Sequence, residues 1–195
     1  PAHNSHCSCF CCLLLVTQSA VYRCFSSKRQ SNKRDCLDSA QLPLQQYSGK
    51  QLVIIAGVGG DLTIQLIQDI VQKHPHLEID FLLCPVRQLY ELRQVLITMK
   101  MGLISEVLVK ENNHFYEILL LASTNNLSPS HKPDSQHKSV SPTGDILWRG
   151  ETAEAQQVAN EYLNKTLRHY KRMQQGLNSP DVDRIVQDYE KIVIN

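Results

Sequence analysis

Hydrophobic and polar positions alternate in blocks from residue 51 onward, and these blocks predict an α/β domain. Residues 51–57 form an apolar run closed by glycines, which is typical of a parallel strand buried on both faces that leads into a helix. The apolar spacing after this run predicts a helix stopped by Pro75. A second buried strand is expected at 79–84, followed by a helix over 89–99 that Gly102 ends.

The rest of the chain predicts a hairpin, a linker and two helices. Apolar runs at 103–110 and 115–123 flank a short polar turn, as in an antiparallel hairpin. Residues 124–150 are rich in Ser, Pro, His and Lys and predict a linker. In 151–195 the apolar residues are spaced for two helices, and Ser179-Pro180-Asp181 opens the second. We expect a helical hairpin there.

The first 35 residues differ from the remainder in composition and pattern. They show no sustained periodicity, and six of the seven cysteines lie within the first 36 residues. The Cys-x-Cys-x-Cys-Cys run at 7–12 is not a paired zinc-ligand spacing, and no clean signal-peptide pattern is present. We therefore interpret 1–35 as an atypical or disordered leader without a metal site, ahead of a domain over 36–123.

Net charge and hydropathy exclude few classes of function. Twenty Lys and Arg balance nineteen Asp and Glu for a net charge of +1, so attraction to nucleic acid must come from local patches. No apolar stretch reaches the roughly 18 residues that a membrane span needs. A soluble, cytoplasmic protein is the expectation.

Three glycines at the carboxyl end of the first predicted strand give the strongest candidate for a binding site. Gly57, Gly59 and Gly60 allow positive φ and close approach of a ligand to the backbone. A tight strand-to-helix turn is the alternative, but three glycines at the carboxyl end of a strand exceed what a turn requires, so a ligand contact is favoured. A dinucleotide fingerprint is disfavoured, because Leu62 stands where a third glycine is required.

Several short sequence motifs resemble those of the TrmK family of bacterial tRNA (adenine-N1) methyltransferases. The similar stretches are Ile55-Ala-Gly-Val-Gly-Gly60, Leu82-Leu-Cys-Pro85 and His114-Phe-Tyr-Glu-Ile118, together with the final pair of helices. This resemblance covers roughly residues 36–195. It implies the second half of a class I (Rossmann-like) methyltransferase sheet with a C-terminal αα-hairpin, S-adenosylmethionine as cofactor, tRNA as partner, and a monomer or weak dimer.

One departure from the family concerns the cofactor site. The family carries an Asp-x-Gly-type turn after its first strand, and residues 1–35 contain no such turn. Because Cys36-Leu37-Asp38 fits the end of the family's third strand, the sheet is expected to begin midway. As a hypothesis, this chain alone binds S-adenosylmethionine poorly. The alternative function is a non-catalytic RNA-binding or scaffold protein that retains a partial methyltransferase core.

The resemblance also assigns candidate residues, each of which has a plainer interpretation. The cofactor-binding candidates are Asp38, Gly57, Val58, Gly59 and Gly60, and the substrate-binding candidates are Pro85, Tyr116, Lys165, Arg168, Lys171 and Arg172. Asp38 also fits an exposed turn, Pro85 a helix start, Tyr116 and Glu117 ordinary sheet packing, and the basic residues a solvated helix face. Asp61 is expected to cap a helix. No catalytic base is identified.

Overall fold

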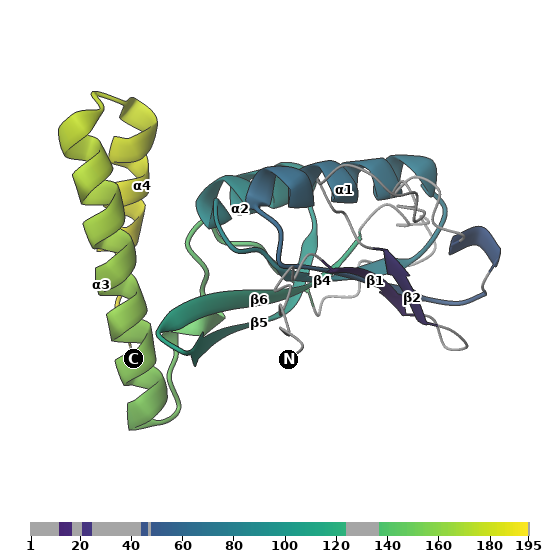
Figure 1. Cartoon of the computed structure of the whole chain (residues 1–195), viewed down its shortest axis with the longest axis horizontal. Helices are drawn as coiled ribbons and strands as arrows, with labels where there is room; N and C mark the ends of the chain where they lie inside the picture. Colours follow the sequence, from purple (N-terminus) through teal and green to yellow (C-terminus); the bar gives the residue numbers. More distant parts are fainter. Residues whose placement is uncertain (1–11, 17–20, 25–43, 47, 124–136, 195) are drawn as a thin grey trace, which may run out of the picture.

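The computed structural model describes residues 12–16, 21–24, 44–46, 48–123 and 137–194. The described strands form one sheet in the order β2-β1-β3-β4-β6-β5-β7 (Figure 1). They are β1 (Cys12–Val16), β2 (Val21–Cys24), β3 (Gln51–Ala56), β4 (Ile79–Cys84), β5 (Gly102–Glu111), β6 (His114–Ala122) and β7 (Lys138–Ser139). The helices are η2 (Leu44–Gln46), α1 (Gly60–Lys73), α2 (Leu89–Thr98), η3 (Ile146–Trp148), α3 (Ala153–Gly176) and α4 (Pro180–Glu190).

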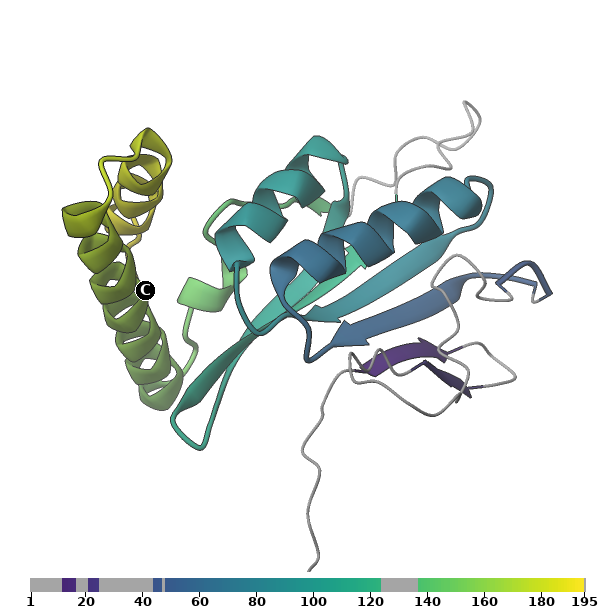
Figure 2. The same cartoon turned by 45° about the horizontal axis from the view of Figure 1, so that its top comes forward.

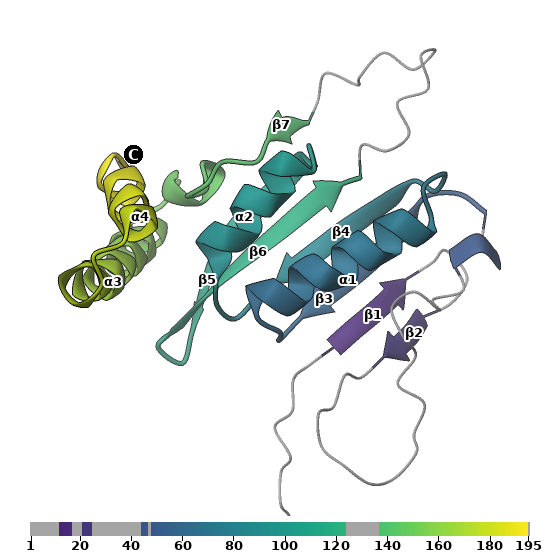
Figure 3. The same ribbon diagram turned by 90° about the horizontal axis from the view of Figure 1, so that it is seen from above.

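The centre of the sheet has the topology that the sequence predicts. Strands β3 and β4 are parallel, as a connection through a helix requires, and α1 joins them. Strand β6 pairs antiparallel with β4 on one side and with β5 on the other, where β5 and β6 form the expected hairpin. Seen from above, these four strands lie side by side beneath α1 and α2 (Figure 3). The prediction of an α/β sheet over these elements is confirmed.

Helices α1 and α2 lie on the same face of the sheet and bury it (Figure 2). In β3 the odd-numbered positions such as Val53 and Ile55 are buried under these helices, together with Phe81 and Leu83 of β4. The even-numbered positions of both strands are only partly buried. The sequence predicts strands buried on both faces. Among the described residues, one face of β3 and β4 is fully buried and the other only partly, although nearly all residues of the two strands are apolar.

Two short strands fall within the segment 1–35, for which the sequence predicts none. Strand β1 pairs antiparallel with β3, and β2 pairs antiparallel with β1. Strands of this length are too short to produce a detectable periodicity. Residues 1–11, 17–20 and 25–35 lie outside the described part of the chain.

The linker expected at 124–150 contains structure where it is described, from residue 137 onward. Strand β7 extends the sheet beside β5, and the single turn of η3 packs against the same strand. Both elements are shorter than any hydrophobic period. Residues 124–136 lie outside the described part.

The C-terminal helices stand beside the tip of the β5–β6 hairpin and contact each other, as the sequence predicts (Figure 1). An aromatic cluster joins them to the sheet domain; it comprises Tyr90, Phe115, Trp148, Tyr162, Tyr170 and Tyr189. The Tyr90 hydroxyl donates to Asp188 of α4 over 2.8 Å. Burial alone would raise the pKa of the Asp188 carboxyl, but hydrogen bonds from Lys191 and Tyr90 lower it below its ordinary value. None of the helices in the described residues has the length and hydropathy of a membrane span.

Candidate functional site

The carboxyl ends of β3 and β4 lie next to each other, and the loops that leave them are hydrogen-bonded together. The Gly57 amide donates to the Cys84 carbonyl over 3.1 Å, and the Gly60 amide donates to the Arg87 carbonyl over 3.0 Å. The glycine turn and the Pro85 loop therefore form one continuous surface. This is the edge of an open α/β sheet at which ligands bind.

Each glycine of the turn has its own structural reason. Gly57 adopts φ +74°, a conformation that favours glycine. A Cβ on Gly59 would lie 2.8 Å from Arg87 Nε, and one on Gly60 would lie 2.5 Å from the Gln88 carbonyl oxygen. Gly59 and Gly60 thus allow the two loops to pack closely, in agreement with the tight-turn interpretation. A role of this turn in cofactor binding stays a prediction.

Gln88 joins the two loops and has an unusual conformation. It occupies the N-cap of α2 with φ 59° and ψ 43°, a left-handed conformation that is uncommon outside glycine and asparagine and that clusters at functional sites. Its side-chain Nε2 donates to Asp61, whereas its buried Oε1 has no hydrogen-bond partner among the described residues. An unsatisfied acceptor therefore lies beside the glycine turn.

Asp61 is not the cap that the sequence predicts. The N-cap of α1 is Gly59, which makes no side-chain hydrogen bond, and Asp61 lies within the first helical turn. The prediction is wrong by two residues, because the glycine turn enters the helix directly. The acidic side chain still lies at the helix end that favours negative charge.

Of the three remaining candidates near the glycine turn, the structure describes Val58 and Pro85. Asp38 lies outside the described residues. Val58 is buried at 7% exposure, and Pro85 is buried at the start of its loop. Burial raises the pKa of the Cys84 thiol, which agrees with a small apolar role for this residue.

The hairpin candidates Tyr116 and Glu117 face opposite sides of the sheet, as alternation requires. Tyr116 is partly buried and its ring lies 6.5 Å from that of His114. Glu117 is fully buried, accepts from Arg93 Nη2 over 2.7 Å, and accepts from the Tyr162 hydroxyl over 2.6 Å. Glu117 thus has a packing role, and its partners are charged or polar rather than apolar.

Arg93 is the centre of a buried polar network that the sequence analysis missed. Its Nη2 also donates to Glu106 over 2.7 Å, and Glu106 in turn accepts the backbone amides of Asp145 and Ile146. Burial alone would lower the pKa of the Arg93 guanidinium, but the carboxylates of Glu117 and Glu106 raise it, so the group stays charged. The only sequence signal was an arginine within the apolar face of a helix.

The network connects the C-terminal helices to the sheet domain. It joins α2, β5, β6, the segment before η3, and α3 through Tyr162, whose pKa is raised by burial and by Glu117. Buried polar groups with complete sets of partners restrict how elements pack. The orientation of α3 beside the hairpin therefore follows from this network together with the aromatic cluster.

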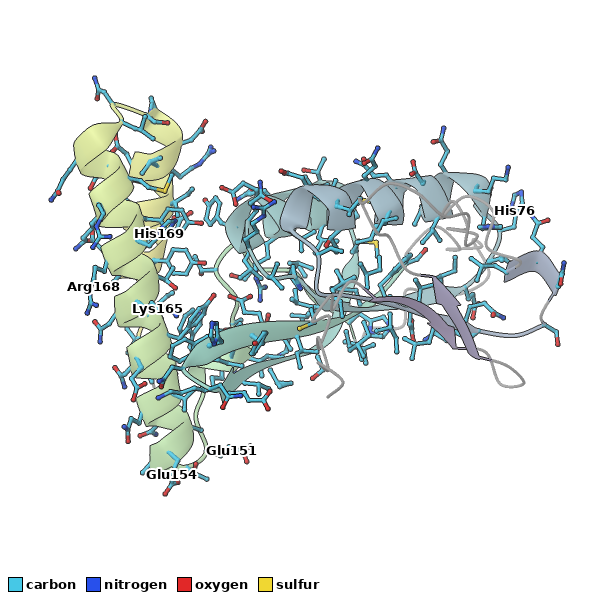
Figure 4. The ribbon with its side chains drawn as sticks, in the orientation of Figure 1. His76, Glu151, Glu154, Lys165, Arg168 and His169 are labelled. Carbon is cyan, nitrogen blue, oxygen red and sulfur yellow. The ribbon has the colours of Figure 1, made fainter. Side chains whose placement is uncertain are left out.

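The basic residues of α3 divide between several surfaces. Lys165 lies with its Nζ 5.1 Å from the centre of the Phe115 ring, whereas Lys171 forms an ion pair with Glu190 of α4 over 2.6 Å. Arg168 and Arg172 are exposed. Figure 4 shows Lys165 and His169 one helical turn apart, with Arg168 on the outer side of the helix. Only some of these cations can therefore meet one ligand.

A cleft of about 300 Å³ separates α3 from the sheet domain. It lies between the loop after Pro85, the tip of the β5–β6 hairpin, and the two C-terminal helices. Its lining residues are Val86, Arg87, Gln88, Leu89, His114, Phe115, Tyr162, Lys165, Thr166, His169, Tyr170 and Tyr189. No carboxylate is among them. We refer to this cavity as the α3 cleft.

The geometry and one family comparison together define the class of protein. A family model described as "Methyltransferase domain" matches residues 23–119, which include β3, β4 and the hairpin. Residues 23–119 are therefore similar to a methyltransferase domain, in agreement with the predicted class I methyltransferase sheet, and the two C-terminal helices follow them. No curated protein matches this sequence.

Solved structures with a similar fold include proteins named as tRNA methyltransferases. A proposed tRNA (m1A22) methyltransferase from Streptococcus pneumoniae matches with a TM-score of 0.50 and 18% identity, over 72% of this chain and 60% of that protein. TrmK from M. capricolum, solved with S-adenosyl-homocysteine, matches with a TM-score of 0.49 and 12% identity, over 72% and 58%. This chain thus spans about 60% of the length of such proteins. The likeness shows a common fold.

Proposed function

We propose that the protein transfers a methyl group from S-adenosylmethionine to N1 of an adenine in tRNA. The observation that carries the proposal is the joined pair of loops at the ends of β3 and β4, with Lys165 of α3 in the cleft beside them. The similarity of the fold to tRNA (m1A22) methyltransferases supports it. This chain spans about 60% of the length of such a protein, and we propose that it is active over the length given.

The cofactor would lie against the glycine turn. Gly57, whose left-handed backbone favours glycine, is the proposed contact, together with Val58, Gly59 and Gly60 of the same turn. Asp38 is the proposed contact to the adenosine. When bound, S-adenosylmethionine supplies an activated methyl group on a sulfonium.

The chemistry needs positioning more than acid or base groups. Adenine N1 has a lone pair in the plane of the ring, so the new N–C bond forms as the S–C bond breaks in line with it. The protein has to hold the adenine with N1 in line with the S–C bond to the methyl group, and to exclude water. N1 lies on the Watson–Crick edge, so the adenine must be unpaired or extruded from a helix.

Pro85 and Gln88 are the proposed contacts to the adenine, with Tyr116 further along the sheet. The unpartnered Gln88 Oε1 is an acceptor, and the exocyclic amine next to N1 is a donor. A hydrogen bond between them, which requires the buried Oε1 to become accessible when the adenine binds, would fix the position of N1. This arrangement would also discriminate against guanine, which carries a carbonyl at that position.

Binding of tRNA is proposed to use Lys165, Arg168, Lys171 and Arg172. The triple variant Lys165→Ala, Arg168→Ala and Arg172→Ala should weaken tRNA binding and flatten its dependence on salt, because each phosphate contact releases counterions. A filter-binding titration at several salt concentrations measures both. An unchanged salt slope refutes this assignment.

The direct test is methylation of tRNA by the purified chain with labelled S-adenosylmethionine. Methylation at N1 blocks the pairing edge, so primer extension would stop at the modified adenine. Gly57→Ala should abolish incorporation because of the positive φ, while Gly176→Ala, which meets no atom within 4 Å, should leave it unchanged. Calorimetry with S-adenosylmethionine reports cofactor binding separately.

The second candidate is a non-catalytic RNA-binding or scaffold protein. It is favoured by the close packing of Gly59 and Gly60 against the neighbouring loop, which accounts for two glycines without a ligand. On this alternative the chain binds tRNA but neither binds S-adenosylmethionine nor incorporates label. The methylation and calorimetry experiments above therefore separate the two candidates.

A further inference from the structure

We infer that the α3 cleft binds an unpaired nucleotide of the RNA strand, adjacent to the adenine that is modified. This site is separate from the glycine turn, and its identification rests on the proposed function only for the choice of RNA as the ligand. The inference follows from three properties of the cleft: its charge, its aromatic lining and its position.

The charge of the cleft favours an anion. Lys165 and Arg87 both line it, no carboxylate does, and neither cation forms an ion pair within the described part of the chain. Lys171, on the same helix but outside the cleft, is neutralised by Glu190. Cationic side chains in a concave site without compensating acids attract phosphate.

The aromatic lining favours a base. Phe115 and Tyr162 lie with their ring centres 5.4 Å apart, and Tyr170 stacks with Tyr189 at 5.9 Å. Phe115 and Tyr170 are only partly buried, so their rings can contact a ligand. Aromatic side chains next to basic ones are the usual platform for single-stranded nucleic acid. The volume of about 300 Å³ lies at the lower end of the range for small-molecule pockets.

The position of the cleft connects it to the proposed methyl-transfer site. The loop residues that line it, Val86 to Leu89, directly follow Pro85. Arg87 also reaches back to the glycine turn, since a Cβ on Gly59 would lie 2.8 Å from its Nε. A strand whose adenine lies at Pro85 would therefore bring its next nucleotide to the cleft.

The test measures binding of RNA in the absence of any methyl donor. The probe is a fluorescein-labelled single-stranded oligoribonucleotide of ten residues that contains one 2-aminopurine, titrated by anisotropy. Lys165→Ala should weaken binding about tenfold and reduce the salt slope by about one. Phe115→Leu should weaken it about tenfold with an unchanged slope, and should reduce the quenching of 2-aminopurine.

The matched control is Lys73→Ala, which removes an equal charge at the far end of α1 and should bind as the unaltered protein does. Arg87→Ala provides a second, exposed variant if Phe115→Leu fails to fold, and should weaken binding severalfold. AMP is the competitor that distinguishes a free nucleotide from an RNA strand. On our inference it competes at least a hundredfold more weakly than the oligonucleotide.

Each of the other outcomes overturns the inference. If the protein binds the oligonucleotide and neither Lys165→Ala nor Arg87→Ala changes its affinity, RNA binds elsewhere. If AMP competes as well as the oligonucleotide, the cleft takes a free nucleotide. If no oligonucleotide binds while tRNA is methylated, the cleft does not hold a strand and the proposed function stands without it. If tRNA is not methylated but the oligonucleotide binds as expected, the proposed function is wrong and the inference about the α3 cleft stands.

Discussion

Replacing Arg93 with methionine should destabilise the protein more than any other conservative change in the described core. Arg93 is fully buried and donates to Glu106 and Glu117 over 2.7 Å each, with a further bond from Nη1 to the Ser141 carbonyl. Methionine fills a similar volume and provides no donor. Arg93→Met therefore leaves two buried carboxylates without their shared cation.

The expected magnitude follows from what each carboxylate keeps. Glu106 still accepts two backbone amides and Glu117 still accepts the Tyr162 hydroxyl, so neither is left without partners. Removing one partner of a buried ion pair usually costs about 3–5 kcal/mol, and we expect a value in this range. Because domains are commonly stable by only about 5–15 kcal/mol, this is a large part of the total.

Urea denaturation followed by tryptophan fluorescence measures the effect. Trp148 is the single tryptophan of the chain, is buried, and lies with its ring 5.6 Å from that of Tyr162. Its emission therefore reports on the junction between the sheet and α3, while circular dichroism reports on the whole chain. Arg184→Met is the control, since this arginine is 61% exposed and pairs with Asp181 at the surface.

A double-mutant cycle decides whether charge is the reason. Adding Glu117→Gln to Arg93→Met removes one of the two uncompensated carboxylates, so the double variant should be more stable than the sum of the single effects by about 1 kcal/mol or more. Strict additivity would refute the electrostatic explanation. So would a cost of Arg93→Met below about 1 kcal/mol, which is typical of a surface pair.

Three further predictions concern stability. Tyr162→Phe removes a buried hydrogen bond to a carboxylate and should cost about 1.5–3 kcal/mol in urea denaturation; no shift of the midpoint contradicts it. Gly60→Ala brings a methyl 2.5 Å from the Gln88 carbonyl oxygen and should cost about 1–3 kcal/mol, whereas Gly176→Ala should not lower the melting temperature; equal effects would count against the packing argument. The pKa of Asp188 is lowered from 3.8, so its stabilising contribution is present above that pH and is lost as pH falls through the lower folded value. Asp188→Asn should therefore be less stable at pH 7 and equally stable near pH 2; a constant difference would contradict the assignment.

The sequence predicted the glycine turn, both central strands, the hairpin and the helical pair, because each has a local signal. A buried strand needs a run of apolar residues, and a turn with positive φ needs glycine, so both can be recognised within ten residues. Gln88 and Arg87 gave no such signal. Their importance arises because the loop after Pro85 packs on Gly59 and Gly60, a contact between segments about 28 positions apart.

The amino-acid sequence by itself determined the α/β class, the order of the elements and the position of the candidate cofactor edge, since periodicity and glycine placement are local properties of the chain. Only the tertiary structure decided which cations share a surface. Lys165 and Lys171 look equivalent in the sequence, yet one lines the α3 cleft and the other is paired with Glu190. The physical reason is that the buried network around Arg93 fixes the orientation of α3, and this orientation depends on contacts that no local pattern records.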